Sequence, residues 1–322
     1  MIDPADTRLR RQKASVRSSQ VTGSDGRVWR AIDIACDQGI ALRLLPDRGL
    51  DISAAWYRGR PLHWTGWSEE ASPVSGLRGH EWETHFFGGL LSTCGLDNVG
   101  EPSEGYPLHG SFNHSPAGTV ATHRADGTIS VSATIDQISD GVRFSSRRHV
   151  ETAIGRGRVS ICDETWHDGD KPVPAPILYH INFGWPLIAA DSEVEIADHL
   201  ESRIEFGDPA DLPGGWSRPG LASGARAAVT VEHRLAPGPS IGRATLVSKT
   251  AGLKVEVSFD RNTLPRLLQW IDCRPDNGVV ALEPANCGTR GRAHDRLHGS
   301  LPFLAPGERR RTSVVIEAEP LH

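Results

Sequence analysis

The chain has 322 residues, with 35 Lys and Arg against 40 Asp and Glu, and a formal net charge of −5. This balance leaves no basic surplus for binding phosphates, so we expect no nucleic-acid partner. The five cysteines are widely spaced and include no Cys-x-x-Cys pair, which predicts reduced thiols. No apolar run has the length of a signal-peptide core or of a membrane span, so we expect a cytoplasmic protein with no membrane partner.

Short β-strand patterns recur from the N-terminal part of the chain onward. Residues 1–27 are polar and predict an N-terminal arm or edge strand. The first strands of a meander are expected at 29–35, 40–45 and 50–57, with turn residues between them. A short helix is expected within 81–91, before a glycine-rich stretch begins.

The strongest strand pattern follows residue 116. Apolar and polar residues alternate through 129–136, which predicts one buried face and one solvated face. The segment Gly155-Arg156-Gly157 predicts a hairpin between strands at 148–154 and 158–166. Further strands are expected at 177–183, 193–196, 226–232, 244–247, 253–259, 266–271, 279–282 and 311–317.

Helix patterns are almost absent, and 34 glycines and 22 prolines separate the strands. No linker divides the chain and no repeat of fixed period is visible. We therefore predict an all-β fold, a single large antiparallel β-sandwich domain over residues 28–318 with very little helix. The turn-rich segment 208–220 either covers a site or forms a solvated surface insertion. Such a sandwich has a concave face where polar side chains from several strands can meet a ligand.

Three ionisable side chains stand in apolar or tightly turned surroundings, where burial would shift their charge state. His109 follows the glycine-rich run 86–100 after one turn-rich loop. His180 shares one face of a predicted strand with Asn182, because side chains two residues apart point the same way. Glu283 lies at the end of an apolar strand and precedes a proline. Taken singly, each is better explained as a hydrogen-bonded core residue or a strand end.

Five short segments occur in order along the chain, at 45–52 (Leu-Pro-Asp-Arg-Gly-Leu-Asp-Ile), 88–100, 108–110 (Leu-His-Gly), 178–184 (Leu-Tyr-His-Ile-Asn-Phe-Gly) and 281–284 (Ala-Leu-Glu-Pro). Together they resemble the galactose mutarotase-like superfamily, and specifically its branch of aldose 1-epimerase-like proteins of long-unassigned substrate. The resemblance extends over roughly residues 28–318. It implies a many-stranded β-sandwich that binds a sugar across its concave face.

In the mutarotases, the positions that match three of these segments carry the chemistry. The resemblance therefore implies that Glu283, His180 and His109 are catalytic. Opening a pyranose hemiacetal requires a base at the anomeric hydroxyl and an acid at the ring oxygen. We expect Glu283 to be the base and His180 the acid, with His109 steadying the ring oxygen or a neighbouring hydroxyl. The resemblance implies no metal and no cofactor.

Further polar residues in or near these segments are expected to bind sugar hydroxyls or to brace the residues that do. They are Arg48, Asp51, Asp97, Asn98, Asn182 and Asn286. A structural ion pair with a neighbouring carboxylate explains Arg48 equally well. Trp82, Trp185 or Trp270 could stack on a sugar ring, although burial in a β core is the better expectation for any one of them.

The sequence thus predicts an isomerase that interconverts the anomers of an aldose or modified sugar, with that small-molecule sugar as its partner. A non-catalytic carbohydrate-binding protein stays open as an alternative, as does an epimerase or lyase that acts on an oxidised sugar with the same acid and base. A glycosidase would need a second carboxylate beside Glu283. A metal site is less favoured because no close-spaced ligand pair is present. The sequence does not indicate the oligomeric state.

Overall fold

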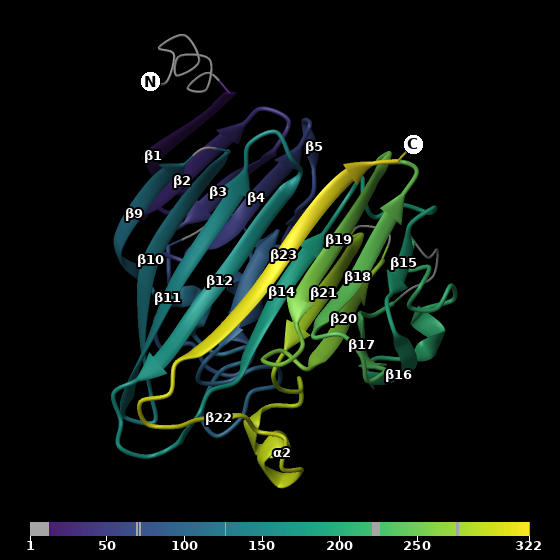
Figure 1. The fold of residues 1–322 in the computed structure, drawn as a ribbon. Coiled ribbons are helices and arrows are strands. Elements are labelled where there is room, and N and C mark those ends of the chain that lie inside the picture. Colours follow the sequence, from purple (N-terminus) through teal and green to yellow (C-terminus); the bar gives the residue numbers. More distant parts are fainter. Residues whose placement is uncertain are drawn as a thin grey trace.

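Two large antiparallel β-sheets packed face to face make up the fold (Figure 1). The computed structural model describes residues 13–68, 70, 72–125, 127–220, 226–274 and 277–321. In these residues the larger sheet has eleven strands and the smaller sheet has eight. The predicted all-β sandwich is confirmed. No helix in the described part of the chain is long and apolar enough to cross a membrane.

The larger sheet contains, in spatial order, β1 (Ala14–Thr22), β2 (Val28–Cys36), β3 (Ile40–Leu45), β4 (Asp51–Tyr57), β8 (Leu91–Gly95), β14 (Ile177–Phe183), β21 (Val279–Ala285), β20 (Arg266–Asp272), β17 (Val229–Leu235) and β16 (His199–Phe206), and β5 (Arg60–Pro61) pairs with β4. The smaller sheet contains β15 (Glu193–Ile196), β18 (Ile241–Ser248), β19 (Leu253–Asp260), β23 (Arg310–Pro320), β12 (Arg158–His167), β11 (Val142–Ala153), β10 (Thr128–Ser139) and β9 (Ala117–Ala125).

Short elements complete the fold. Two two-stranded pairs are β6 (Trp64–Thr65) with β7 (Gly88–Gly89) and β13 (Val173–Pro174) with β22 (Phe303–Leu304). The helical elements are α2 (Arg292–Leu297) and the 3₁₀ turns η1 (Glu81–His85), η2 (Phe112–His114) and η3 (Pro209–Asp211).

Most predicted strands are present, and the hairpin at 155–157 is confirmed, since β11 and β12 pair with Thr152 opposite Val159. The helix expected within 81–91 is the 3₁₀ turn η1. Among the strands of five or more residues, β8, β9 and β16 were not predicted, and several two-residue strands were not predicted either. β8 is buried on both faces, while most side chains of β9 and β16 are exposed or half-buried. None of the three strands shows a clear apolar–polar alternation.

At the N-terminal side, β1 is an edge strand that pairs with β2 along its whole length. Residues 1–12 lie outside the described residues. The division of the chain after residue 27 into an arm and one domain stays a prediction.

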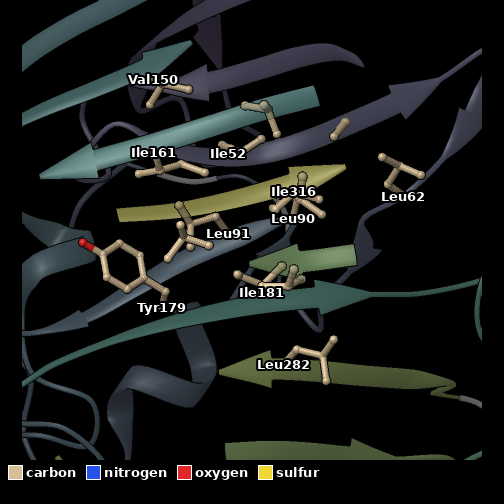
Figure 2. Close-up of a cluster of buried hydrophobic side chains, with 14 of the residues drawn as sticks. Ile52, Leu62, Leu90, Leu91, Val150, Ile161, Tyr179, Ile181, Leu282 and Ile316 are labelled. Carbon is tan, nitrogen blue, oxygen red and sulfur yellow. The ribbon is translucent and has the colours of Figure 1, made fainter. Parts of the chain in front are cut away.

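The hydrophobic core lies between the two sheets (Figure 2). Ile181 of β14 and Leu282 of β21 reach into it from the larger sheet, and Ile161 of β12 and Ile316 of β23 reach into it from the smaller sheet. On β12 every second side chain is buried, as expected for a sheet with one solvated face. On β14 and β21 every residue is buried, so loops also cover the outer face of the larger sheet at its centre.

A buried ionic network connects the two sheets. Arg148 of β11 donates hydrogen bonds to Asp163 on β12 and to Asp51 on β4, with Nη1 lying 2.6 Å from Asp51 Oδ1. Tyr179 of β14 donates to Asp163 at 2.6 Å. Burial raises the pKa of Asp51 to about 6, an effect that Arg148 and the bonds from Thr93 oppose. The network therefore occupies Asp51, which was expected to bind a sugar hydroxyl or to brace a residue that does.

We expect Arg148→Leu to lower the free energy of unfolding by about 3–5 kcal/mol, because it leaves two buried carboxylates without their cation. The neighbouring Arg147 is exposed and lies 3.8 Å from Glu164, so Arg147→Leu is a matched control that should cost less than about 1 kcal/mol. Urea denaturation of the two variants measures the difference. Equal losses would contradict a structural role for the buried network.

Candidate active site

The centre of the site is a pair of side chains on two neighbouring strands. β14 and β21 pair so that Ile181 is opposite Leu282 and Leu178 is opposite Ala285, a register that places His180 opposite Glu283. His180 Nε2 lies 3.0 Å from Glu283 Oε1, and both side chains are buried. Since Ile181 points into the core, His180 lies on the outer face of the larger sheet.

Asn182 sets the proton positions on His180. Its Nδ2 donates to the carbonyl oxygens of Gly88 and His180 at 3.2 and 3.1 Å, so its Oδ1 faces His180 Nδ1 at 2.5 Å. His180 therefore carries a proton on Nδ1, and Nε2 faces Glu283. Asn182 is thus a residue that positions His180.

Burial moves the two pKa values of the pair in opposite directions. It lowers the pKa of His180 to about 4, an effect that the hydrogen bond donated by His180 to Asn182 opposes, and it raises the pKa of Glu283 to about 8. Between these values the two side chains hold one proton in the Nε2···Oε1 contact. A carboxyl group and an imidazole that share a proton near neutral pH are suited to acid–base chemistry.

His109 is the third member of the cluster. Its ring centroid lies 5.8 Å from that of His180 and 4.7 Å from that of Trp82. Its backbone φ is 57°, and its carbonyl and amide bond to Gly95 and Gly100 at 3.0 and 2.9 Å. The Gly100 amide also points to Nδ1 of His109 at 3.4 Å, so the proton of the neutral ring is on Nε2. Burial, together with His180, lowers the pKa of His109 to about 3. His109 is therefore a neutral donor held in a left-handed backbone conformation.

Asp97 and Asn98 hold the loop that presents His109. Asp97 Oδ1 accepts from the backbone amides of Asn98 and Ser111, both at 2.9 Å. Asn98 Nδ2 donates to the carbonyl oxygens of Glu101 and Pro107, both at 2.9 Å. Both side chains are buried. Of the two roles expected for them, bracing is the one that these contacts provide.

Arg48, Asp51 and Asn286 do not line the cavity around His180. Arg48 is buried and donates from Nε to the Asn113 carbonyl oxygen at 2.6 Å. Asn286 Oδ1 accepts from the Ile177 amide at 2.7 Å and so ties the end of β21 to the start of β14. These hydrogen bonds of the three side chains are to other groups of the protein.

His109, His180 and Glu283 together line a cavity of about 210 Å³. Its aromatic lining consists of Trp67, Trp82, Phe86, Phe206 and Trp270. Its other polar lining side chains are Glu83, Glu101, Thr230 and Thr289. No Lys or Arg is among these described lining residues. In the described part of the chain, no group of three or more His, Cys, Asp and Glu side chains could hold a metal ion.

The cavity contains predicted and unpredicted residues. Trp82 and Trp270 line it, and Trp82 is also buried, as was the better expectation for each tryptophan. Trp185 lies at a different cavity. Phe206 and Thr230 were not predicted, because they belong to ordinary strand sequence in β16 and β17. Only the packing of those strands beside β20 and β21 brings them to the site.

Comparisons with solved structures identify the fold as that of the galactose mutarotase-like proteins. The structure is similar to a candidate aldose 1-epimerase from Klebsiella pneumoniae, with a TM-score of 0.86 at 20% identity over 95% of this chain and 83% of that chain. A galactose mutarotase-like protein from Clostridium acetobutylicum has a TM-score of 0.63 at 14% identity over 95% and 99%. Galactose 1-epimerase from Lactobacillus acidophilus NCFM has a TM-score of 0.61 at 15% identity over 96% and 99%. Identities this low show the fold alone.

The chain belongs to the family described as a domain of unknown function, DUF4432, whose sequence model matches residues 26–318. No curated protein sequence matches it. The fold implied by the resemblance to the galactose mutarotase-like superfamily, found from five short segments, is confirmed.

Asn98→Ala should lower the free energy of unfolding by about 1–3 kcal/mol, because two buried carbonyl groups lose their donor. Asn262, which is exposed and bonds to Asp260, provides the matched control, and Asn262→Ala should change stability by less than about 0.5 kcal/mol. Chemical denaturation followed by tryptophan fluorescence measures both. If the two variants are equally stable, Asn98 does not brace the loop.

Proposed function

We propose that the protein is an aldose 1-epimerase-like enzyme that interconverts the anomers of a sugar. The observation that carries this proposal is the buried His180–Glu283 pair, whose Nε2 and Oε1 atoms lie 3.0 Å apart in a small aromatic cavity. The fold shared with the galactose mutarotase-like proteins supports it.

The reaction requires two proton transfers at one hemiacetal. In the reactive tautomer, the shared proton is on His180 Nε2 and Glu283 is a carboxylate. His180 donates its proton to the ring oxygen, Glu283 accepts the proton of the anomeric hydroxyl, and the bond between C1 and the ring oxygen breaks. The open-chain aldehyde forms and the pair keeps one proton, now on Glu283. Rotation about C1–C2 and the reverse transfers close the ring as the other anomer.

The neighbouring residues support these transfers. Asn182 Oδ1 accepts a hydrogen bond from Nδ1–H of His180 in both tautomers, which stabilises the imidazolium when it forms. His109 has its proton on Nε2 and can donate a hydrogen bond to the ring oxygen or to an adjacent hydroxyl. A donor that stays neutral adds no positive charge beside the imidazolium.

The cavity favours a neutral monosaccharide unit at this position. Its volume of about 210 Å³ is below the roughly 300–1,000 Å³ typical of sites for drug-sized ligands. Glu83 and Glu101 lie in its lining, and its described residues include no Lys or Arg to bind a phosphate or a carboxylate. This charge pattern weighs against an oxidised sugar acid as the substrate, and hence against the epimerase or lyase alternative.

Glu283→Gln should reduce anomerisation by roughly 10²–10⁴-fold, because the amide cannot accept the hydroxyl proton. Polarimetry or saturation-transfer NMR on a panel of neutral aldoses measures the rate. Glu319→Gln, an exposed substitution on β23, is the matched control and should retain the wild-type rate. A Glu283→Gln protein with the wild-type rate would refute the proposal. Deuterium entering a carbon-bound position in deuterated water would instead indicate carbon deprotonation.

The pH dependence of kcat/KM should follow the shared proton. Below a pH of about 4, His180 and Glu283 are both protonated and no base remains. Above a pH of about 8, the pair has lost its proton and no acid remains. A bell-shaped profile with these two limbs is expected after subtraction of the uncatalysed rate. Limbs at the ordinary values of 4.5 for Glu and 6.5 for His would contradict the desolvated pair.

A further inference from the structure

A second cavity adjoins the first. Its volume is about 470 Å³, and its walls come from the segment around β6 and from the segment that follows β14. Trp67 lines both cavities. None of the functions described above uses the second cavity.

The lining of the second cavity combines exposed indole rings with neutral polar groups. Trp185 is 70% exposed and Trp67 is 51% exposed. Thr65 supplies a hydroxyl, His63 an imidazole and Asn277 an amide oxygen, since Asn277 Nδ2 donates to Asp272 at 2.5 Å. No Lys, Arg, Asp or Glu is among the described lining residues. Covering exposed indole surface with a ligand lowers the free energy of the complex, because apolar surface is removed from water. Neutral hydrogen-bonding groups then orient an uncharged polar ligand. A sugar ring has both an apolar face and hydroxyl groups at its edge.

An aromatic wall connects this lining to the acid–base pair. The ring centroid of Trp67 lies 6.0 Å from that of Phe86, and the ring centroid of Phe86 lies 5.2 Å from that of His180. Two ring contacts therefore separate the shared Trp67 from the reactive histidine. A ligand whose anomeric carbon lies at Glu283 can extend past Trp67 toward Trp185.

We propose that the second cavity is a subsite for a second neutral sugar ring, joined through a glycosidic bond to a carbon of the substrate other than the anomeric one. The substrate class is then a reducing disaccharide or a longer reducing oligosaccharide. This inference rests on the proposed function for the position of the reducing ring.

Binding measurements test the subsite without relying on turnover. Isothermal titration with cellobiose, maltose and lactose, and with glucose as the monosaccharide of their reducing ends, gives the dissociation constants. We expect at least one disaccharide to bind the wild-type protein about 10-fold more tightly than glucose, because it covers a further aromatic surface. Trp185→Ala should remove this advantage and leave the affinity for glucose unchanged. Since Trp185 is mostly exposed, the variant should fold, which circular dichroism checks.

Trp166→Ala is the matched control, since Trp166 is a half-buried tryptophan on β12 of the other sheet and should leave the disaccharide advantage intact. The subsite is refuted if no disaccharide binds more tightly than glucose, or if Trp185→Ala weakens both ligands equally. It is also refuted if the wild-type protein is a dimer that Trp185→Ala dissociates, because the indole would then be an interface residue. Failure of the proposed function has a different signature, in which Glu283→Gln does not affect turnover while the Trp185-dependent binding persists.

Discussion

The geometry of the sandwich depends on one buried guanidinium. Arg148 reaches from the smaller sheet to Asp51 on the larger sheet, and Asp163 links the same cation to Tyr179 on β14. A buried cation is tolerated only when its partners surround it, so the network favours the arrangement of the two sheets that brings these partners together. Because Tyr179 must point inward to meet Asp163, its neighbour His180 points to the outer face. The contact that joins the sheets thereby also orients the acid–base pair.

Burial of His180 and Glu283 on the outer face of the larger sheet then makes the pair suited to acid–base chemistry. The same removal of water raises the pKa of Glu283 and lowers the pKa of His180, and so poises one proton between them. The loop around His109 adds a neutral donor in a left-handed backbone conformation, which Asp97 and Asn98 hold in place. Desolvated ionisable groups and a strained backbone both cost stability, which is typical of a functional site.

The sequence predicted the fold well where one sheet face is solvated, as through residues 129–136, because burial then leaves an alternating pattern. It failed for β8, which is buried on both faces, and for β16, whose side chains are mostly exposed or half-buried. Among the candidate site residues, Asp97 and Asn98 could be assigned to two roles, since a short polar side chain after a glycine-rich run can bind a ligand or brace a loop. Only their bonds to the backbone distinguished these roles.

By itself, the sequence determined that His180 and Asn182 share one strand face, because side-chain direction in a strand follows from a period of two. The expectation that Glu283 ends its strand was wrong, because β21 continues past Pro284 to Ala285 and both residues still pair with β20. The five segments of the sequence also indicated the fold of the galactose mutarotase-like proteins. The tertiary structure decided that His180 stands opposite Glu283, since the register between β14 and β21 joins segments a hundred residues apart. The tertiary structure also pairs Asp51 with Arg148 and places Trp67 in the lining of two cavities. Such contacts between distant segments depend on packing and leave no local sequence pattern.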